Sequence, residues 1–128
     1  MALGDKQVIP TIAVSDIGAA REYYEGTLGL SGGEESPAGG VRYSCGGGSE
    51  LHVYPSLDNA GKSPATLAAF EVDDIEAIVD ELTGKGVKFE QYDMDSLKTD
   101  EKGIAELGEL KGAWFKDPDG NVLAIAEE

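Results

Sequence analysis

The even positions of residues 8–14 form one apolar row, and this period of two predicts a β-strand. Apolar residues then recur at helical spacing through residues 17–28, which predicts a helix with a single apolar stripe. Ser15 or Asp16 is placed to cap this helix, and Gly29 lies near its end. The beginning of the chain therefore predicts a strand followed by a helix.

The second half of the chain shows the same order of patterns. Residues 67–72 alternate as a strand does, and residues 75–82 carry an apolar stripe at helical spacing. Asp73 and Glu76 have the spacing of a capping box at the start of this helix, and Gly84 is placed to end it. A strand and a helix are thus predicted twice.

A short motif marks the junction of strand and helix in both halves, because Val14-Ser15-Asp16-Ile17 returns as Val72-Asp73-Asp74-Ile75. After the helices, further strands are expected at residues 31–35, 40–45, 49–55, 87–92, 112–116 and 121–126. The sequence therefore indicates an α+β protein made of two βαβββ modules, at about residues 6–57 and about 65–128, within one domain at 1–128. Two copies of one small unit suggest a cavity built between them.

Residues 93–111 are mostly polar, and no period assigns them to a helix or a strand. A segment of this length without a clear pattern is typical of a mobile loop. We expect such a loop to be able to cover the cavity.

The chain holds 25 acidic and 10 basic residues, which gives a net charge of −15. Nucleic-acid and anionic membrane surfaces bind clustered Lys and Arg, so neither is an expected partner. The ordinary interpretation of this acidity is solubility, and attraction of cationic ligands is the alternative. With one cysteine, no internal disulfide can form, and neither a signal peptide nor an apolar run of about 18 residues is present. A cytoplasmic location is expected.

Three stretches resemble the vicinal oxygen chelate superfamily, which includes glyoxalase I, extradiol dioxygenases, fosfomycin resistance enzymes and bleomycin resistance proteins. The stretches are Val14-Ser15-Asp16-Ile17, Tyr23-Tyr24-Glu25-Gly26-Thr27-Leu28-Gly29-Leu30 and Trp114-Phe115-Lys116-Asp117-Pro118-Asp119-Gly120-Asn121. The resemblance covers essentially the whole chain. It implies that the two modules curl into a mixed sheet with a cup-shaped cavity, that the ligand lies on the concave face, and that the protein is a homodimer.

Metal-using members of that superfamily place their ligands at matching positions of the two modules, and these positions fall here on Ile9, His52, Leu67 and Ala124. Only His52 has a side chain that can bind a metal. One imidazole does not hold a catalytic divalent ion, which usually takes three protein ligands. No metal and no cofactor are therefore expected, although Glu50 and Glu71 leave a rearranged oxygen-rich site as an alternative.

Other candidate motifs have simpler interpretations. The Asp117-Pro118-Asp119-Gly120-Asn121 stretch begins like a calcium loop but lacks the later glutamate, so it is predicted to be a turn. Gly46-Gly47-Gly48 is expected to form a hairpin rather than a phosphate cradle. Cys45 is expected to be a structural thiol, and Lys98 and Lys102 to be solvated lysines of the loop.

Alternation along the strands places seven candidate ligand-binding residues on the cavity side of the sheet. They are Thr11, His52, Tyr54, Leu67, Ala69, Trp114 and Ala124. Aromatic surfaces with a few polar groups suit a small organic ligand, because apolar burial supplies affinity and the polar groups fix orientation. The alternative is that Trp114 and Tyr54 only fill the cavity or a dimer contact.

Two functions remain after this comparison. The first is metal-independent binding of a small organic molecule, as the resemblance to bleomycin resistance proteins implies. The second is a lyase, isomerase or dioxygenase of the glyoxalase type, with an altered metal site or with His52 as a general base. The absent ligands at Ile9, Leu67 and Ala124 favour the first.

Overall fold

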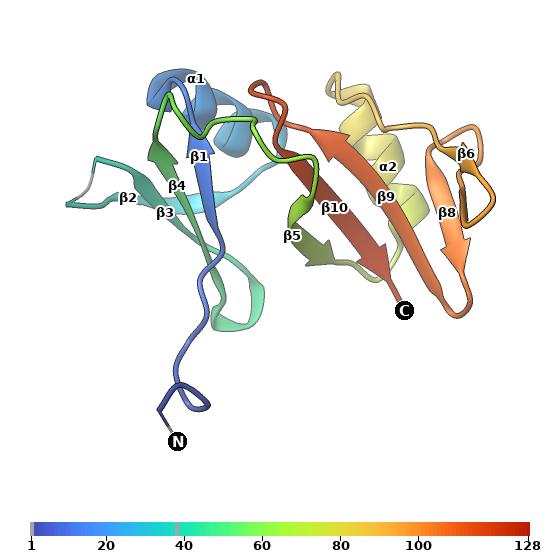
Figure 1. Ribbon diagram of the computed structural model, residues 1–128, viewed down its shortest axis with the longest axis horizontal. Coiled ribbons are helices and arrows are strands. Elements are labelled where there is room, and N and C mark those ends of the chain that lie inside the picture. Colours follow the sequence, from blue (N-terminus) through green and yellow to red (C-terminus); the bar gives the residue numbers. More distant parts are fainter. Residues whose placement is uncertain (1, 38) are drawn as a thin grey trace.

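The computed structural model describes residues 2–37 and 39–128 and contains two similar modules (Figure 1). The strands are β1 (Thr11–Val14), β2 (Ser31–Glu35), β3 (Val41–Ser44), β4 (Glu50–Pro55), β5 (Thr66–Glu71), β6 (Asp93–Met94), β7 (Leu97–Lys98), β8 (Ile104–Leu107), β9 (Leu110–Lys116) and β10 (Val122–Glu127). The helical elements are α1 (Ile17–Arg21), the π-helical η1 (Glu22–Thr27), the 3₁₀ turn η2 (Gly46–Gly48) and α2 (Ile75–Gly84). No helix in the described part of the chain is long and apolar enough to cross a membrane.

Each module forms a four-stranded mixed sheet with the same topology. The first sheet has the order β1-β4-β3-β2, and the second has the order β5-β10-β9-β8. The first strand of each module pairs in parallel with the last, and the other pairs are antiparallel. The βαβββ repeat and the α+β class predicted from the sequence are therefore confirmed.

Asp16, one of the two predicted caps, is the N-cap of α1. Its carboxylate accepts hydrogen bonds from the backbone N–H groups of Gly18 and Ala19, which would otherwise have no partner at a helix start. In the second module the predicted cap, Asp73, is wrong by one residue. Asp74 has the extended backbone of a cap and accepts from the N–H of Ala77.

The first strand is shorter than predicted. Pairing with β4 starts at Thr11, and Val8 is 83% exposed. At the start of this pairing the Pro10 carbonyl accepts a hydrogen bond from the His52 N–H. The residues that precede Pro10 extend away from the sheet (Figure 1). The apolar row that predicted a strand over residues 8–14 is thus buried only at its end.

Residues 87–111 depart most from the prediction. Residues 87–92 form no strand. Their contact with β9 is a bridge from Phe89 to Phe115 and a hydrogen bond from the Glu90 N–H to the Trp114 carbonyl. The expected loop instead contains the β6-β7 hairpin and β8. Thr99 and Asp100 accept backbone N–H groups there, so the polar side chains that suggested a loop hold a turn together.

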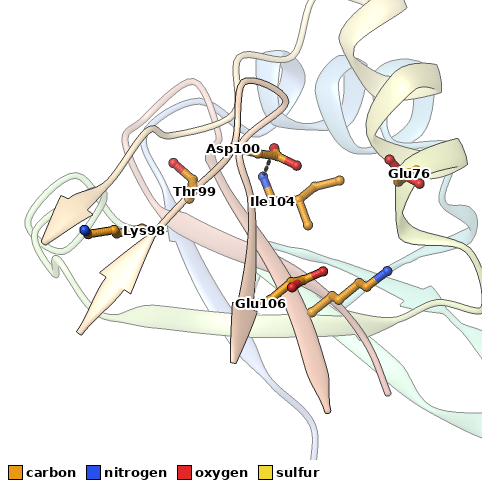
Figure 2. Close-up of a pocket in the computed structure, with 7 residues that line it drawn as sticks. Glu76, Lys98, Thr99, Asp100, Ile104 and Glu106 are labelled. Carbon is orange, nitrogen blue, oxygen red and sulfur yellow. Dashed lines mark hydrogen bonds between the residues drawn. The ribbon is translucent and has the colours of Figure 1, made fainter. Parts of the chain in front are cut away.

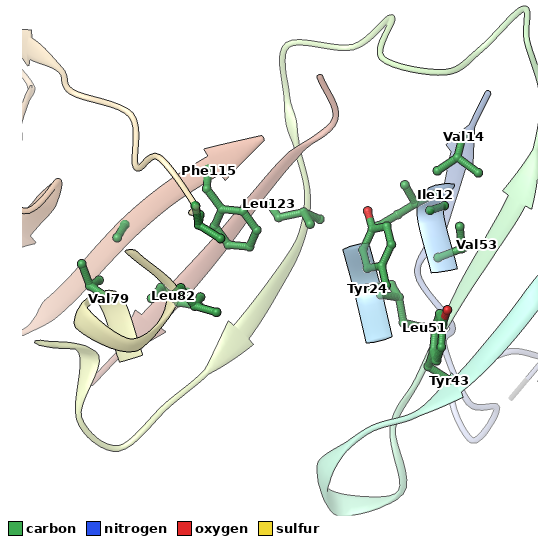
Figure 3. Close-up of a cluster of buried hydrophobic side chains, with 14 of the residues drawn as sticks. Ile12, Val14, Tyr24, Tyr43, Leu51, Val53, Val79, Leu82, Phe115 and Leu123 are labelled. Carbon is green, nitrogen blue, oxygen red and sulfur yellow. The ribbon is translucent and has the colours of Figure 1, made fainter. Parts of the chain in front are cut away.

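The helix-covered faces of the two sheets meet in one hydrophobic core (Figure 3). We call these the inner faces and the opposite ones the outer faces. Inner and outer residues alternate along the strands, as the period of two requires, except at the register shifts in the β2-β3 and β5-β10 pairs. Fully buried members include Ile12, Val53, Tyr24, Phe115 and Leu123.

A buried carboxylate ties the two modules together. Asp117 is 5% exposed and precedes the turn between β9 and β10. Its Oδ2 accepts from the Tyr24 hydroxyl at 2.8 Å and from the Asn121 amide at 2.9 Å. Its Oδ1 accepts from the backbone N–H groups of Asp119 and Asn121. Every acceptor site on this buried charge is therefore used, which makes the burial tolerable.

Asn121 and Asp119 extend the same network to other segments. The Asn121 amide donates to the Ala13 carbonyl at 2.8 Å, and its oxygen accepts from the Gly61 N–H at 3.0 Å. The Asp119 carboxylate accepts from both the backbone and the hydroxyl of Ser15. We call this network of Asp117, Asp119 and Asn121 the latch, because it joins β1, η1 and the linker to the second sheet.

We expect Tyr24→Phe to make stability less dependent on alkaline pH. Burial, together with the neighbouring Asp117 carboxylate, raises the pKa of Tyr24. The unfolded chain ionises this phenol above about pH 10 while the folded chain keeps it neutral, so its contribution is complete below that pH and is lost above it. The free energy of unfolding of the variant should therefore fall less steeply at alkaline pH than that of the parent. At neutral pH the variant should be less stable by about 1–3 kcal/mol, because a hydrogen bond to a carboxylate is missing. Urea unfolding between about pH 8 and pH 11 measures both effects. Equal alkaline slopes in parent and variant would contradict the assignment.

Gly61→Ala should be more destabilising than Gly48→Ala. Both glycines have positive φ, at 67° and 80°, so alanine at either costs roughly 1–2 kcal/mol of backbone strain. A Cβ on Gly61 would also collide with the Asp119 carbonyl, whereas nothing lies within 4 Å of one on Gly48. The additional cost at Gly61 should be about 1–3 kcal/mol by urea unfolding. Equal losses would show that the linker does not depend on this close contact.

Candidate functional site

The outer face of the first sheet carries three of the predicted site residues. His52 lies on β4 between Thr11 of β1 and Arg42 of β3, so the three form one row across the sheet. Tyr54 follows two residues later, beside Ala13. Thr11, His52 and Tyr54 thus share one face, as alternation predicted.

His52 is held by the turn between β2 and β3. Its Nε2 lies 3.1 Å from the Ser36 hydroxyl, which also accepts the Gly40 N–H. The Ser36 proton is therefore available to a neutral imidazole. The imidazole stacks with Tyr54 at a centroid distance of 6.0 Å, and a side chain on Gly40 would collide with it. His52 is an oriented polar group that still has part of its surface exposed.

Arg42 is a charged residue of this face that sequence reasoning did not select. Its guanidinium pairs with the Glu50 carboxylate at 2.9 Å, and both side chains are partly exposed. An exposed pair of this kind contributes little to stability. The alternation that selected His52 also places Arg42 beside it, so register was the signal that could have found it.

The outer face of the second sheet carries the other group. Ala69 of β5, Ala124 of β10 and Trp114 of β9 are direct neighbours across the strands. Two alanines beside a tryptophan leave the indole without a bulky neighbour in its row. Leu67 falls at a register shift between β5 and β10 and packs partly buried against the core, so its place in the ligand site stays a prediction.

The indole of Trp114 lies along the sheet over Gly112. A Cβ built on Gly112 would be 3.2 Å from the Trp114 Cη2 atom, so the glycine leaves the space that the ring occupies. Tyr92 meets this indole edge to face, at a centroid distance of 5.8 Å. We call Trp114 with Tyr92 the aromatic platform. Tyr92 was missed although it falls in the strand predicted over residues 87–92, because that segment forms no strand and Tyr92 reaches Trp114 from irregular backbone.

The two outer groups occupy different sheets. Among the described residues, no strand pair, hydrogen bond or aromatic contact joins His52 or Tyr54 to Ala124 or Trp114. Both groups lie opposite the inner faces that share the core. The convergence of Ile9, His52, Leu67 and Ala124 on one cavity therefore stays a prediction.

A cavity of about 740 Å³ opens between the ends of the two sheets. Ala69 is the one predicted ligand-binding residue that lines it, beside Cys45 and the alternative oxygen donors Glu50 and Glu71. Burial raises the pKa of the Cys45 thiol, so its thiolate is disfavoured, in agreement with a structural thiol. In the described part of the chain, no three His, Cys, Asp or Glu side chains are grouped so that they could hold a metal ion.

The lysines of the predicted loop lie beside β8 and α2. Lys98 lines a polar cavity of about 520 Å³ beside β8, together with Glu76 and Asp100 (Figure 2). The Asp100 carboxylate is already occupied there by the Ile104 N–H. Lys102 pairs with Asp80 of α2, and that hydrogen bond raises the pKa of its amine. This cavity contains none of the predicted ligand-binding residues.

Solved structures share the fold along nearly the full length of the chain. TnmS3, an antibiotic binding protein from Streptomyces sp. CB03234, has a TM-score of 0.67 and 21% identity over 99% of this chain and 98% of its own. A glyoxalase/bleomycin resistance protein from the same organism has a TM-score of 0.64 and 20% identity, covering 94% and 98%. An integron cassette protein from the mobile metagenome of the Halifax Harbour sewage outfall has a TM-score of 0.70 and 16% identity, covering 97% and 99%.

Sequence comparison assigns the family more directly than these structures do, since their low identity shows the fold alone. No curated protein matches the chain. The family model of the Glyoxalase/Bleomycin resistance protein/Dioxygenase superfamily, however, matches residues 7–125. This range includes the first module, the second module as far as Ile125 of β10, the latch and the two outer groups. The chain belongs to the Glyoxalase/Bleomycin resistance protein/Dioxygenase superfamily.

Proposed function

We propose that the protein binds a planar aromatic small molecule on its outer faces without a metal ion. The observation that carries this proposal is the aromatic platform. The Trp114 indole occupies the space beside Gly112 and is only partly buried, so part of its surface remains for a ligand to contact. Stacked and edge-to-face aromatic contacts contribute about 0.5–1.5 kcal/mol beyond burial of area. A planar ring system makes best use of such a surface.

The small residues beside the platform support the same conclusion. Ala69 and Ala124 continue the row of Trp114 across the sheet, and neither fills the space above it. Glu90 and Lys116 form an ion pair at 3.4 Å next to the platform and supply polar groups at its margin. Apolar surface with a few polar groups nearby is the usual composition of a small-molecule site.

His52 is assigned to orienting the ligand rather than to general base catalysis. Its Nε2 is engaged by the Ser36 hydroxyl, and its ring stacks on Tyr54. Among the described residues no acidic partner fixes the imidazole as a catalytic base would require. The metal-binding alternative has little support, because no suitable group of ligands is present in the described residues.

The comparison with TnmS3 supports binding of a small molecule in general. That protein is described as an antibiotic binding protein, and it shares this fold over nearly its entire chain. At 21% identity the likeness does not transfer its ligand. The chemistry of the platform, and not the comparison, is the reason for proposing a planar aromatic compound.

We further propose that the protein is a homodimer in which each site combines the first sheet of one copy with the second sheet of the other. The His52 and Trp114 groups lie on the outer faces, whereas the inner faces are buried in the shared core. Within one chain, among the described residues, no strand pair or aromatic contact joins the two groups, so a second chain is proposed to complete a site that holds both. β1 and β5 are also edge strands, so each has one side that pairs with no other strand of its sheet. Unpaired strand edges favour association.

Substitution of Trp114 or His52 should weaken ligand binding. Acridine is a suitable planar probe, and Trp114 is the one tryptophan in the sequence, so its fluorescence reports binding at the platform. His52→Ala should cost about 1–3 kcal/mol of binding free energy through loss of a polar partner. Gly112→Ala, which pushes the indole away from the sheet, should weaken binding as well. Trp114→Ala should weaken binding in calorimetry, where no tryptophan is needed.

Leu57→Ala is the matched control, since this side chain is 77% exposed and lies on the linker. All variants must keep the cooperative urea transition of the parent. Unchanged affinity in both Trp114→Ala and His52→Ala would contradict the proposed site. Stoichiometric metal in protein purified without chelators, measured by plasma emission, would instead favour the enzymatic alternative.

A mixture of two defective variants tests the shared site. If His52 and Trp114 of different copies form one site, a mixed dimer of His52→Ala and Trp114→Ala has one intact site and one doubly defective site. About half of the chains refold into mixed dimers after equal mixing, so roughly a quarter of parental binding capacity should return. Return of no high-affinity sites would mean that each site lies within one chain. Light scattering that gives the mass of one chain would exclude the dimer altogether.

A further inference from the structure

The hydroxyl of Ser36 lies between two groups that constrain where its proton points. Ser36 follows β2, and its backbone N–H donates to the Gly40 carbonyl at 2.8 Å, which closes the turn to β3. The Gly40 N–H donates back to the Ser36 Oγ at 3.1 Å, and the His52 Nε2 lies 3.1 Å from the same oxygen. A side chain on Gly40 would collide with the Val53 carbonyl and with the His52 Nε2. The turn is therefore held closely against the imidazole.

The two neutral tautomers of His52 fit this contact differently. If Nε2 carries no proton, it accepts the Ser36 proton, and the hydroxyl then donates once and accepts once. If Nε2 carries the proton, two N–H groups point at the hydroxyl, and its own proton has no acceptor among the described residues. The contact is partly buried, so an unpaired proton there is unfavourable. The turn thus favours the tautomer with its proton on Nδ1.

The Nδ1 atom of His52 is open to a ligand. It has no hydrogen-bond partner among the described residues, since the contact with Ser36 is made by Nε2. In that part of the chain, no buried side-chain nitrogen or oxygen lacks a partner, so Nδ1 must be accessible from outside. The ring keeps part of its surface exposed beside Tyr54 as well. A proton on Nδ1 is therefore available to a bound molecule.

We infer that Ser36 is a positioning residue that fixes His52 as a neutral hydrogen-bond donor, and that the ligand carries an acceptor on the edge of its ring. An unprotonated ring nitrogen or a carbonyl oxygen offers the lone pair that an Nδ1–H group needs. A ligand without such an acceptor leaves this donor unpaired, which costs affinity. The assignment of the ligand rests on the proposed function, whereas the tautomer is a property of the free protein.

Nitrogen magnetic resonance tests the tautomer directly, because His52 is the only histidine in the sequence. At about pH 8, where an ordinary imidazole is neutral, the ring nitrogen without a proton resonates far downfield of the other. Couplings to the ring protons identify each nitrogen. We expect the downfield signal to come from Nε2 in the parent and in Ser36→Thr, which keeps the hydroxyl. Ser36→Ala should shift the proton toward Nε2.

Ser96→Ala is the matched control, because Ser96 is exposed in the turn between β6 and β7. Its spectrum should equal that of the parent. A proton on Nε2 in the parent would overturn the inference, whether or not the variants fold. An unchanged tautomer in folded Ser36→Ala would show that Ser36 does not set it.

Naphthalene and quinoline test the ligand assignment, because they share one shape and differ by a single ring nitrogen that can accept. We expect the preference for quinoline, measured as the ratio of the two Kd values, to fall by about threefold to tenfold in Ser36→Ala. Comparing ratios cancels the different hydration of the two probes. Arg42, the neighbouring donor in the row of His52, is unchanged in this variant.

The outcomes separate this inference from the proposed function. Equal ratios in parent and Ser36→Ala, with both probes bound, would overturn the acceptor assignment and leave binding of aromatic molecules intact. Failure of quinoline, naphthalene and acridine to bind would contradict the proposed function and the ligand assignment together. The nitrogen spectrum of the free protein decides the role of Ser36 in either case.

Discussion

The buried carboxylate of Asp117 is the interaction on which the arrangement of the modules depends. Burying a charge costs several kcal/mol unless hydrogen bonds replace its water. Here Tyr24 comes from η1, while Asn121 and two backbone N–H groups come from the turn that Asp117 itself begins. The carboxylate is satisfied only when the turn is formed and η1 is packed beside it. One residue thereby makes the structure of the second module conditional on the first.

This condition also decides which surfaces remain for function. The latch holds the helix-covered faces of the two sheets toward each other, and the side chains of these faces are buried in the common core. The opposite faces keep Trp114 and His52 accessible. Gly112 and Gly40 matter at these places because each leaves room for an aromatic ring on the sheet. The absence of a side chain thus positions the functional groups as much as any hydrogen bond does.

Much of the fold follows from the sequence because the apolar periods are repeated. Alternation placed Ile12 and Phe115 in the core, and it placed His52 and Trp114 on the other faces. The β8 strand was missed because its short run of two buried residues, Ile104 and Ala105, is surrounded by polar turns. A pattern of that length does not separate a strand from a loop.

The site was less accessible to prediction for a different reason. Leu67 has the alternation of an outer residue, but it falls at a register shift between β5 and β10 and packs against the core. Register shifts depend on pairing across the sheet and leave no period in the sequence. Tyr92 reaches Trp114 from an irregular segment, so its role follows from tertiary contact alone. The sheet positions were therefore predictable, whereas the surroundings of each site residue were not.

The long separation of the latch residues also shapes how the chain is made. Asn121 binds the carbonyl of Ala13, across 108 positions of sequence. During synthesis the first module leaves the ribosome well before its partner turn exists, so the Tyr24 hydroxyl and the Ala13 carbonyl still lack the partners that they have in the folded chain. Incompletely packed nascent chains are prone to aggregate or to recruit chaperones. The contacts that join the first module to the second can therefore form only after the Asp117 turn has been synthesised.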